Sequence, residues 1–404
     1  MKIKFHQGQL SEPKLEALKE FMDLSYPTGR KLRTFKENIG VLGSSLSFSS
    51  SSNSFSISLK GIEKNLPQLL QQIDSLIKLP EVNEKNLKTI ANIFKTDRKQ
   101  EEDDAVLIAQ AIAQYGLYGE NSLLSNRLTV KEISNITVSE YLTLWKEVKS
   151  RAVSIHFSGK TNASDLKKLL AQNLTLNYNG TSEVPYPVAL VKRDRNEVVL
   201  IDNNKIRQSH LFFIKNTGIY TKADDSRTAL FKQYFDGGFS GILTQEVREY
   251  RSLAYSSSAN INYTLAKKPE SYFTTYIGTQ ADKTNESVQL TYDLIQNMPK
   301  KPERLTDIKK NVILKQQADF PDFRELSSVV ESYLIIGYKQ DPNELSAPEY
   351  KEISFNNLVS FYENKIQAQA TFLGIHGDSK QFDIKELEKI GKIIKLKKED
   401  VIRF

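Results

Sequence analysis

An internal repeat constrains this chain more than any other feature of its sequence. Gly61 has a counterpart in Gly278, at an offset of 217 residues, and similar segments follow both. The tetrapeptide KEIS occurs at residues 131–134 and again at residues 351–354. The segments RAVSIHFSGKTNASDLKKLL and AQATFLGIHGDSKQFDIKELEKI both read as a strand, a glycine turn and a leucine-periodic helix. A nearly constant offset over separate blocks predicts two copies of one domain.

We place the first copy at residues 1–180 and the second at residues 197–404, with a linker at residues 181–196. Two prolines and mixed charges at the join interrupt any regular element and favour a connecting segment. The length of 404 residues fits more than one domain, because single hydrophobic cores stop growing beyond roughly 250–300 residues.

Each copy is predicted to contain both strands and helices. Residues 46–59, LSFSSSSNSFSISL, alternate apolar residues with serines, which predicts a hairpin with one buried face and a Ser-Asn turn. Leucines and isoleucines between Leu66 and Ile77 then recur at helical spacing. Antiparallel strands with helices on one face form a layered domain. The predicted fold class is therefore α+β, with two similar tandem domains that each have an antiparallel sheet and helices packed on one side.

Composition excludes several classes of function. The chain has no cysteine, which excludes disulfides, thiolate chemistry and cysteine zinc sites. No apolar run approaches the ~20 residues of a membrane-spanning helix, and no apolar signal sequence is visible, so we expect no membrane span and leave periplasm and cytoplasm open. The net charge of +7 suits a binder of carboxylates as well as a weak nucleic-acid binder. Because RNP motifs, zinc fingers and arginine-rich arms are all missing, we expect no nucleic-acid partner.

Residues 240–259, SGILTQEVREYRSLAYSSSA, place an arginine and a tyrosine seven residues apart across a predicted helix-to-strand junction. Alignment of VLGSSLSFSS with REYRSLAYSS sets Arg248 against Val41 and Tyr255 against Phe48. The first copy accepts Val and Phe at these positions, so the fold itself does not demand Arg and Tyr. The alternative is that Arg248 is a solvated helix charge and Tyr255 a half-buried ring. The contrast between the copies favours a function for the pair.

The stretch GGFSGILTQEVREYRSLAYSSSA resembles the C-terminal motif of the M16 peptidases, the insulysin and pitrilysin family, and so does YGENS at residues 118–122. Members of that family are clamshells of four similar domains in two halves. One half carries an inverted zinc motif, His-x-x-Glu-His. The other half carries an arginine and a tyrosine that reach the peptide at the metal. The resemblance implies that Arg248 and Tyr255 are that pair and stabilise a carbonyl oxygen of the substrate.

The chain itself has no His-x-x-Glu-His sequence, and its histidines are isolated from one another: His6, His156, His210 and His376. We expect structural roles for His156 and His376, and zinc only in a partner half. The resemblance therefore implies the substrate-clamping, non-zinc half of an M16-type metallopeptidase, inactive alone and partnered by a zinc-bearing half or subunit and a peptide substrate. The alternative is a proteolytically inactive scaffold or peptide-binding subunit with the M16 fold.

Two further segments have simpler interpretations. The glycines of YFDGGFSGIL lack the Gly-Lys-Ser ending of a phosphate-binding loop, so we predict a turn with close helix packing. The charge run KTDRKQEEDDAV at residues 95–106 predicts a solvated helix face.

Overall fold

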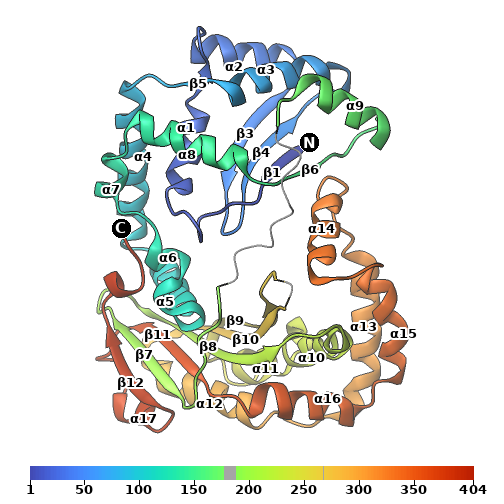
Figure 1. Ribbon diagram of the computed structural model, residues 1–404. Coiled ribbons are helices and arrows are strands. Elements are labelled where there is room, and N and C mark those ends of the chain that lie inside the picture. The colour runs from blue at the N-terminus through green and yellow to red at the C-terminus, as the bar shows by residue number, and fades with distance from the viewer. Residues whose placement is uncertain (177–187, 267) are drawn as a thin grey trace.

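The computed structural model describes residues 1–176, 188–266 and 268–404, and these contain two main sheets with helices around them (Figure 1). The strand orders are β3-β4-β1-β6 in the first sheet and β12-β7-β11-β8-β10-β9 in the second. The predicted α+β class is confirmed. Of the predicted linker, residues 181–187 lie outside the described residues, and residues 188–196 hold no helix or strand.

The first sheet is antiparallel throughout. Its strands are β1 (Lys2–Phe5), β3 (Ser45–Ser50), β4 (Phe55–Lys60) and β6 (Val153–His156). The predicted serine hairpin is confirmed, with Phe48 opposite Ile57. Its apolar face packs on helices of the same half. These helices are α1 (Leu15–Asp23), α2 (Leu32–Val41), α3 (Leu66–Lys78), α4 (Lys85–Glu101), α8 (Val138–Ser150) and α9 (Ala163–Asn173). A short ladder joins β2 (Tyr26–Pro27) to β5 (Pro80–Glu81).

The second sheet is larger and mixed. Its strands are β7 (Glu197–Asp202), β8 (Gln208–Ile219), β9 (Ala254–Tyr263), β10 (Glu270–Gln280), β11 (Phe372–Gly377) and β12 (Lys392–Leu396). Strands β8 to β10 pair antiparallel, as predicted, whereas β11 and β12 both pair in parallel with β7. The strands of this parallel end alternate little between apolar and polar residues, because both of its faces are covered.

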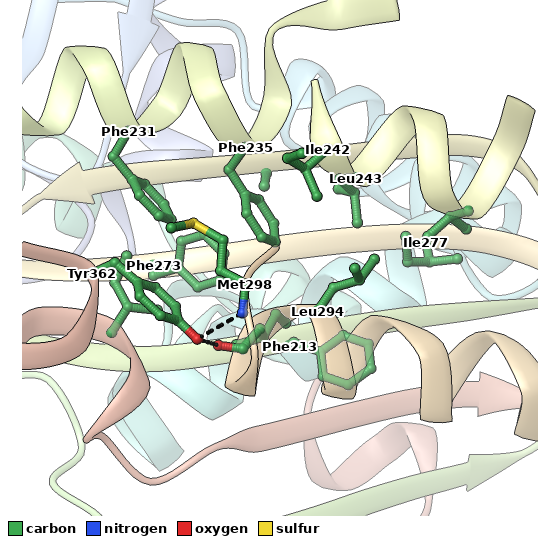
Figure 2. Packing of buried hydrophobic residues seen from close by; sticks show 14 of the residues in the cluster. Phe213, Phe231, Phe235, Ile242, Leu243, Phe273, Ile277, Leu294, Met298 and Tyr362 are labelled. Carbon is green, nitrogen blue, oxygen red and sulfur yellow. Dashed lines mark hydrogen bonds between the residues drawn. The ribbon is translucent and has the colours of Figure 1, made fainter. Parts of the chain in front are cut away.

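Helices of the second half cover one face of this sheet with an aromatic core (Figure 2). They are α10 (Asp225–Asp236), α11 (Ile242–Thr244), α12 (Thr284–Gln296), α13 (Leu305–Ala318), α15 (Pro342–Glu352), α16 (Phe355–Tyr362) and α17 (Ile384–Glu388). The Phe231 ring stacks on that of Phe235 and meets Phe273 edge-on. Buried Tyr362 is satisfied, because its hydroxyl accepts from the Met298 backbone and donates to the Ile295 carbonyl.

Each half of the chain contributes one helix that packs on the sheet of the other half. Helix α5 (Ala105–Tyr118) of the first half buries Ile112 against the second sheet, so closely that a side chain at Gly374 would clash with it. Helix α14 (Leu326–Ile336) of the second half reaches the first sheet, where Ser327 bonds His156 and Glu331 bonds Lys4. Each sheet is therefore contacted on its second face by a helix from the other half, a cover that the repeat did not predict.

The KEIS identity between the copies is not a structural equivalence. The first KEIS lies in α7 (Val130–Ser134), whereas the second ends α15 and supplies the N-cap of α16, Ser354. In the first copy, the capping residue of the matching long helix α8 is Thr137. Thr137 lies three residues after Ser134, the last residue of the first KEIS. The residue that aligns with Ser354 in the structure is therefore Thr137, about one helical turn further along the chain than the sequence match indicates.

The charge run at 95–106 is not simply a solvated face. Arg98 is only 4% exposed and donates to both carboxylate oxygens of Glu16 at 2.8 Å. It also contacts Glu101, which accepts a 2.6 Å hydrogen bond from Arg127. Arg127 in turn donates to the carbonyl of Arg403 at the C-terminus. The prediction failed for Arg98 because its main partner lies on another helix.

Short elements complete the chain, among them α6 (Leu123–Asn126). Within the described residues, no helix is both long and apolar enough to cross a bilayer.

Candidate functional site

The helix that carries Arg248 changes its winding before it ends. Helix α11 (Ile242–Thr244) continues as a π-helical segment, Gln245–Glu249, in which the Tyr250 amide donates to the Gln245 carbonyl at 2.9 Å. Ser252 then adopts a left-handed conformation with φ of 51°. Such π segments and strained residues are frequent at functional sites. Strained residues cost free energy of folding, which the surrounding structure must offset. They let the chain enter β9 within a few residues of Arg248.

Tyr255 lies on a β-bulge. In the β9–β10 ladder, Gly278 pairs with Ser256 and Thr279 with Ala254, so Tyr255 has no partner opposite it. A bulge leaves one residue out of the ladder and redirects its side chain. The Tyr255 side chain accordingly points away from the core and is 61% exposed.

The first copy shows what happens without the bulge. The β3–β4 ladder is continuous, and Phe48, at the position aligned with Tyr255, is buried in the core at 5% exposure. Val41, aligned with Arg248, is an exposed residue at the end of α2. The exposure of Tyr255 therefore comes from a local device that only the second copy has. The half-buried ring considered as an alternative does not occur.

Gln280 orients the Tyr255 hydroxyl. Its side-chain amide donates to the Tyr255 oxygen at 2.7 Å from the end of the neighbouring strand β10. Because the hydroxyl accepts this bond, its own proton stays available for another acceptor. Gln280 was not predicted as a site residue, although it lies two residues after the repeated glycine Gly278, at the open end of the β9–β10 hairpin.

Arg248 is held loosely in comparison with its neighbour. Arg251 forms an ion pair with Glu246 at 2.6 Å, whereas the nearest acid to Arg248 is Glu249 at 3.7 Å. The Arg248 side chain is 48% exposed, and its guanidinium carbon lies 5.8 Å from the centre of the Phe239 ring. No hydrogen bond joins Arg248 to Tyr255 in the described part of the chain. Both side chains therefore keep hydrogen-bond donors for a ligand.

All four histidines make contacts within the fold. His6 and His156, far apart in sequence, both lie near Glu331, with Nε2 atoms 3.7 and 3.5 Å from its carboxylate. His376 bonds the Ala105 carbonyl, and burial lowers the pKa of His376 to about 4. His210 contacts the hydroxyl of Tyr276 at 2.9 Å.

These residues do not fit a zinc site. Among the described residues, no three His, Cys, Asp or Glu side chains form a group that could hold a metal ion. The approach of His6 and His156 to Glu331 was not predicted, but the Lys4 ammonium lies 2.5 Å from the same carboxylate. That cluster already contains a positive charge where a metal would bind.

Comparison with known proteins finds a family model that is similar to the part of the chain that carries this site. Residues 148–312 match the model of the peptidase M16 inactive domain. This segment is similar to the peptidase M16 inactive domain. It includes Arg248, Tyr255 and Gln280, together with the hairpin that carries the bulge.

Solved structures extend the M16 likeness over nearly the whole chain. The peptidase M16 inactive domain from Pseudomonas fluorescens has a TM-score of 0.73 at 16% identity, covering 94% of this chain and 92% of that one. The periplasmic protease PqqL from Escherichia coli has a TM-score of 0.69 at 15% identity, covering 94% of this chain but 42% of its own. The ferredoxin protease FusC, bound to Arabidopsis ferredoxin, has a TM-score of 0.70 at 13% identity, with coverage of 93% and 42%.

At these identities the likeness shows the fold, and no curated protein matches the sequence. This chain therefore has a fold similar to that of somewhat less than half of the longer proteases PqqL and FusC.

Proposed function

We propose that this chain is the non-zinc, substrate-clamping half of an M16-type zinc metallopeptidase. The observation that carries the proposal is the bulge at Tyr255. It exposes a tyrosine seven residues after a loosely paired arginine in the second copy, where the first copy has a buried phenylalanine. A scaffold would gain nothing from a bulge that exposes the Tyr255 ring, whereas a substrate clamp needs both hydrogen-bond donors exposed.

The chemistry follows from the charge that develops during peptide hydrolysis. When water adds to a peptide carbonyl, negative charge accumulates on its oxygen, and fixed donors aimed at that oxygen lower the barrier. Tyr255 offers an O–H that Gln280 leaves free to donate, and Arg248 offers a guanidinium that keeps its charge at any physiological pH. In this proposal the zinc and its attacking water belong to a partner half that closes over the peptide.

The alternative is a peptide-binding or scaffold subunit that never takes part in cleavage. The lack of a metal-binding group in the described residues fits this alternative as well. The two functions differ in whether Arg248 affects turnover once a zinc-bearing partner is present.

The test is to mix this chain with the His-x-x-Glu-His half from the same source and follow cleavage of a fluorogenic peptide library. We expect cleavage only in the mixture, and a large loss of turnover with Arg248→Ala. Arg251→Ala is the matched control, because Arg251 lies three residues away but is paired with Glu246. Binding of the partner without cleavage, or equal rates for both variants, would favour the scaffold.

A further inference from the structure

We propose that Phe239 and Arg248 together form a subsite for an aromatic side chain of the bound peptide. The inference rests on the proposed function, because it names the kind of residue that the clamp holds beside Tyr255. Phe239 is 75% exposed, although phenylalanine is ordinarily a buried residue type. Single exposed apolar residues are common on protein surfaces, so the inference rests on the braced turn beneath the ring and on the guanidinium next to it.

The turn next to Phe239 requires glycines at two positions. Gly238 has φ of +62°, a conformation that glycine adopts at low cost. A side chain at Gly241 would come within 2.5 Å of a backbone nitrogen on the other side of the turn. The predicted turn with close helix packing is thereby confirmed, and it sets Phe239 at the tip.

Arg304 braces the same turn from α13. Its guanidinium donates to the Ser240 carbonyl at 3.1 Å and to the Gln245 side chain at 2.6 Å. The second bond also anchors the first residue of the π-helical segment that carries Arg248. Phe239 and Arg248 are therefore held on one braced unit. A preorganised unit loses little conformational entropy when it binds.

The contact between the two residues defines the chemistry of the subsite. The guanidinium of Arg248 lies 5.8 Å from the centre of the Phe239 ring, within the range of a cation–π contact. A second aromatic ring can stack on the planar guanidinium or on the exposed edge of Phe239. Lysine and arginine side chains of the peptide would be repelled by the same guanidinium. The surface therefore selects aromatic over small and basic residues.

The position of the subsite ties it to the reacting carbonyl. Arg248 would donate to a peptide carbonyl, and side chains of an extended peptide follow one another at about 3.3 Å along the strand. Because the Arg248 guanidinium also contacts Phe239, a side chain next to the carbonyl that Arg248 binds would lie close to the Phe239 ring. We infer that Phe239 determines which residue is preferred next to the clamped carbonyl.

The experiment measures peptide binding rather than cleavage. Fluorescein-labelled Ser/Ala decapeptides that each carry one Phe, at successive positions, are titrated with the intact chain by fluorescence anisotropy, beside an all-Ser/Ala peptide. We expect wild type to bind the best Phe peptide roughly tenfold more tightly than the Ser/Ala peptide. Phe239→Ala should reduce that ratio to near one. Phe320→Ala is the matched control, because Phe320 is 70% exposed in the irregular segment after α13.

The ratio decides the outcome. A Phe preference that survives Phe239→Ala, or that is absent from wild type, overturns the proposal, and so does an equal loss of affinity for all peptides. Partial retention of the preference by Phe239→Leu supports a packing role for the side chain. The proposed function fails separately, because peptide binding with the expected preference can occur in a chain that never supports cleavage.

Discussion

The Nζ atom of Lys4 lies 2.5 Å from Oε2 of Glu331, which joins strand β1 of the first half to helix α14 of the second. His6 and His156 face the same carboxylate, so three basic side chains of the first half meet one acid of the other. Helix α14 has no buried residue, and these polar contacts hold it at the first sheet. By contrast, α5 is seated on the second sheet by apolar packing.

We predict that Glu331→Gln lowers the free energy of unfolding by about 2 kcal/mol at pH 7 and flattens its dependence on acid pH. Burial works to raise the pKa of Glu331, but hydrogen bonds from His156 and Lys4 outweigh it and hold the pKa well below 4.5. The stabilisation is therefore complete above pH 4.5 and is lost as the pH falls below it. Urea unfolding at pH 7 and pH 3.5 measures both effects. Glu325→Gln, which removes an exposed carboxylate next to α14, should change neither. Equal acid sensitivity of wild type and Glu331→Gln would show that the contacts of Glu331 do not stabilise the position of α14.

The buried guanidinium of Arg98 gives a second prediction. Arg98→Met should cost about 3–5 kcal/mol, because it leaves the Glu16 carboxylate without its charged partner and takes one of two arginines from Glu101. The exposed pair Arg33–Glu37 has the same 2.8 Å separation as Arg98–Glu16, yet Arg33→Met should cost less than about 0.5 kcal/mol. Chemical denaturation of both variants measures the contrast. Similar losses at the two sites would mean that burial does not govern the strength of these pairs.

The burial of Lys215 predicts that the free energy of unfolding changes at alkaline pH. Its ammonium is buried against the carbonyls of Gln367 and Gln369, and burial lowers the pKa of Lys215 from 10.5 to about 8. Between pH 8 and 10.5 the unfolded chain binds a proton that the folded chain does not, so stability rises with pH in this window. Wild type should gain roughly 3 kcal/mol relative to Lys215→Met across it. The free energy of unfolding is measured at pH 8 and at pH 10.5 for wild type and Lys215→Met, with Lys205→Met, at an exposed position, as the control. Equal changes with pH in wild type and Lys215→Met would contradict the prediction.

Gln280 should act only through Tyr255. Gln280→Leu removes the donor that orients the Tyr255 hydroxyl, and we expect kcat of the assembled enzyme to fall about fivefold. In a Tyr255→Phe background the same change should have no further effect, because its target is gone. A double-mutant cycle measures this coupling. Additive losses would show that Gln280 contributes in some other way.

The serine hairpin was predictable because its signal is local. Serines alternate with apolar residues from Leu46 to Leu59, and a half-buried strand pair requires that pattern. The helical face from Leu66 to Ile77 is equally local, and α3 covers it. The antiparallel hairpins and the turn near Gly238 followed from the same kind of reasoning.

The features that expose the candidate site depend on distant partners. The bulge at Tyr255 arises from its register with Gly278 and Thr279, which no single strand encodes. The π-helical winding before Tyr250 was likewise not predicted from the residue pattern. Burial of Arg98 depends on Glu16, which is 82 residues away. The position of Arg248 and Tyr255 could thus be proposed from the sequence, while the device that turns Tyr255 outward could not.

The most direct test of the central claim is the turnover of the assembled enzyme with Tyr255→Phe, beside Tyr250→Phe as control. Tyr250 is a tyrosine of similar exposure, 63% against 61%, five residues earlier in the chain. If Tyr255 stabilises the carbonyl oxygen, kcat falls roughly a hundred- to thousandfold in Tyr255→Phe and stays within about twofold of wild type in Tyr250→Phe. An unchanged kcat in Tyr255→Phe would contradict the account and leave this chain a scaffold with the M16 fold.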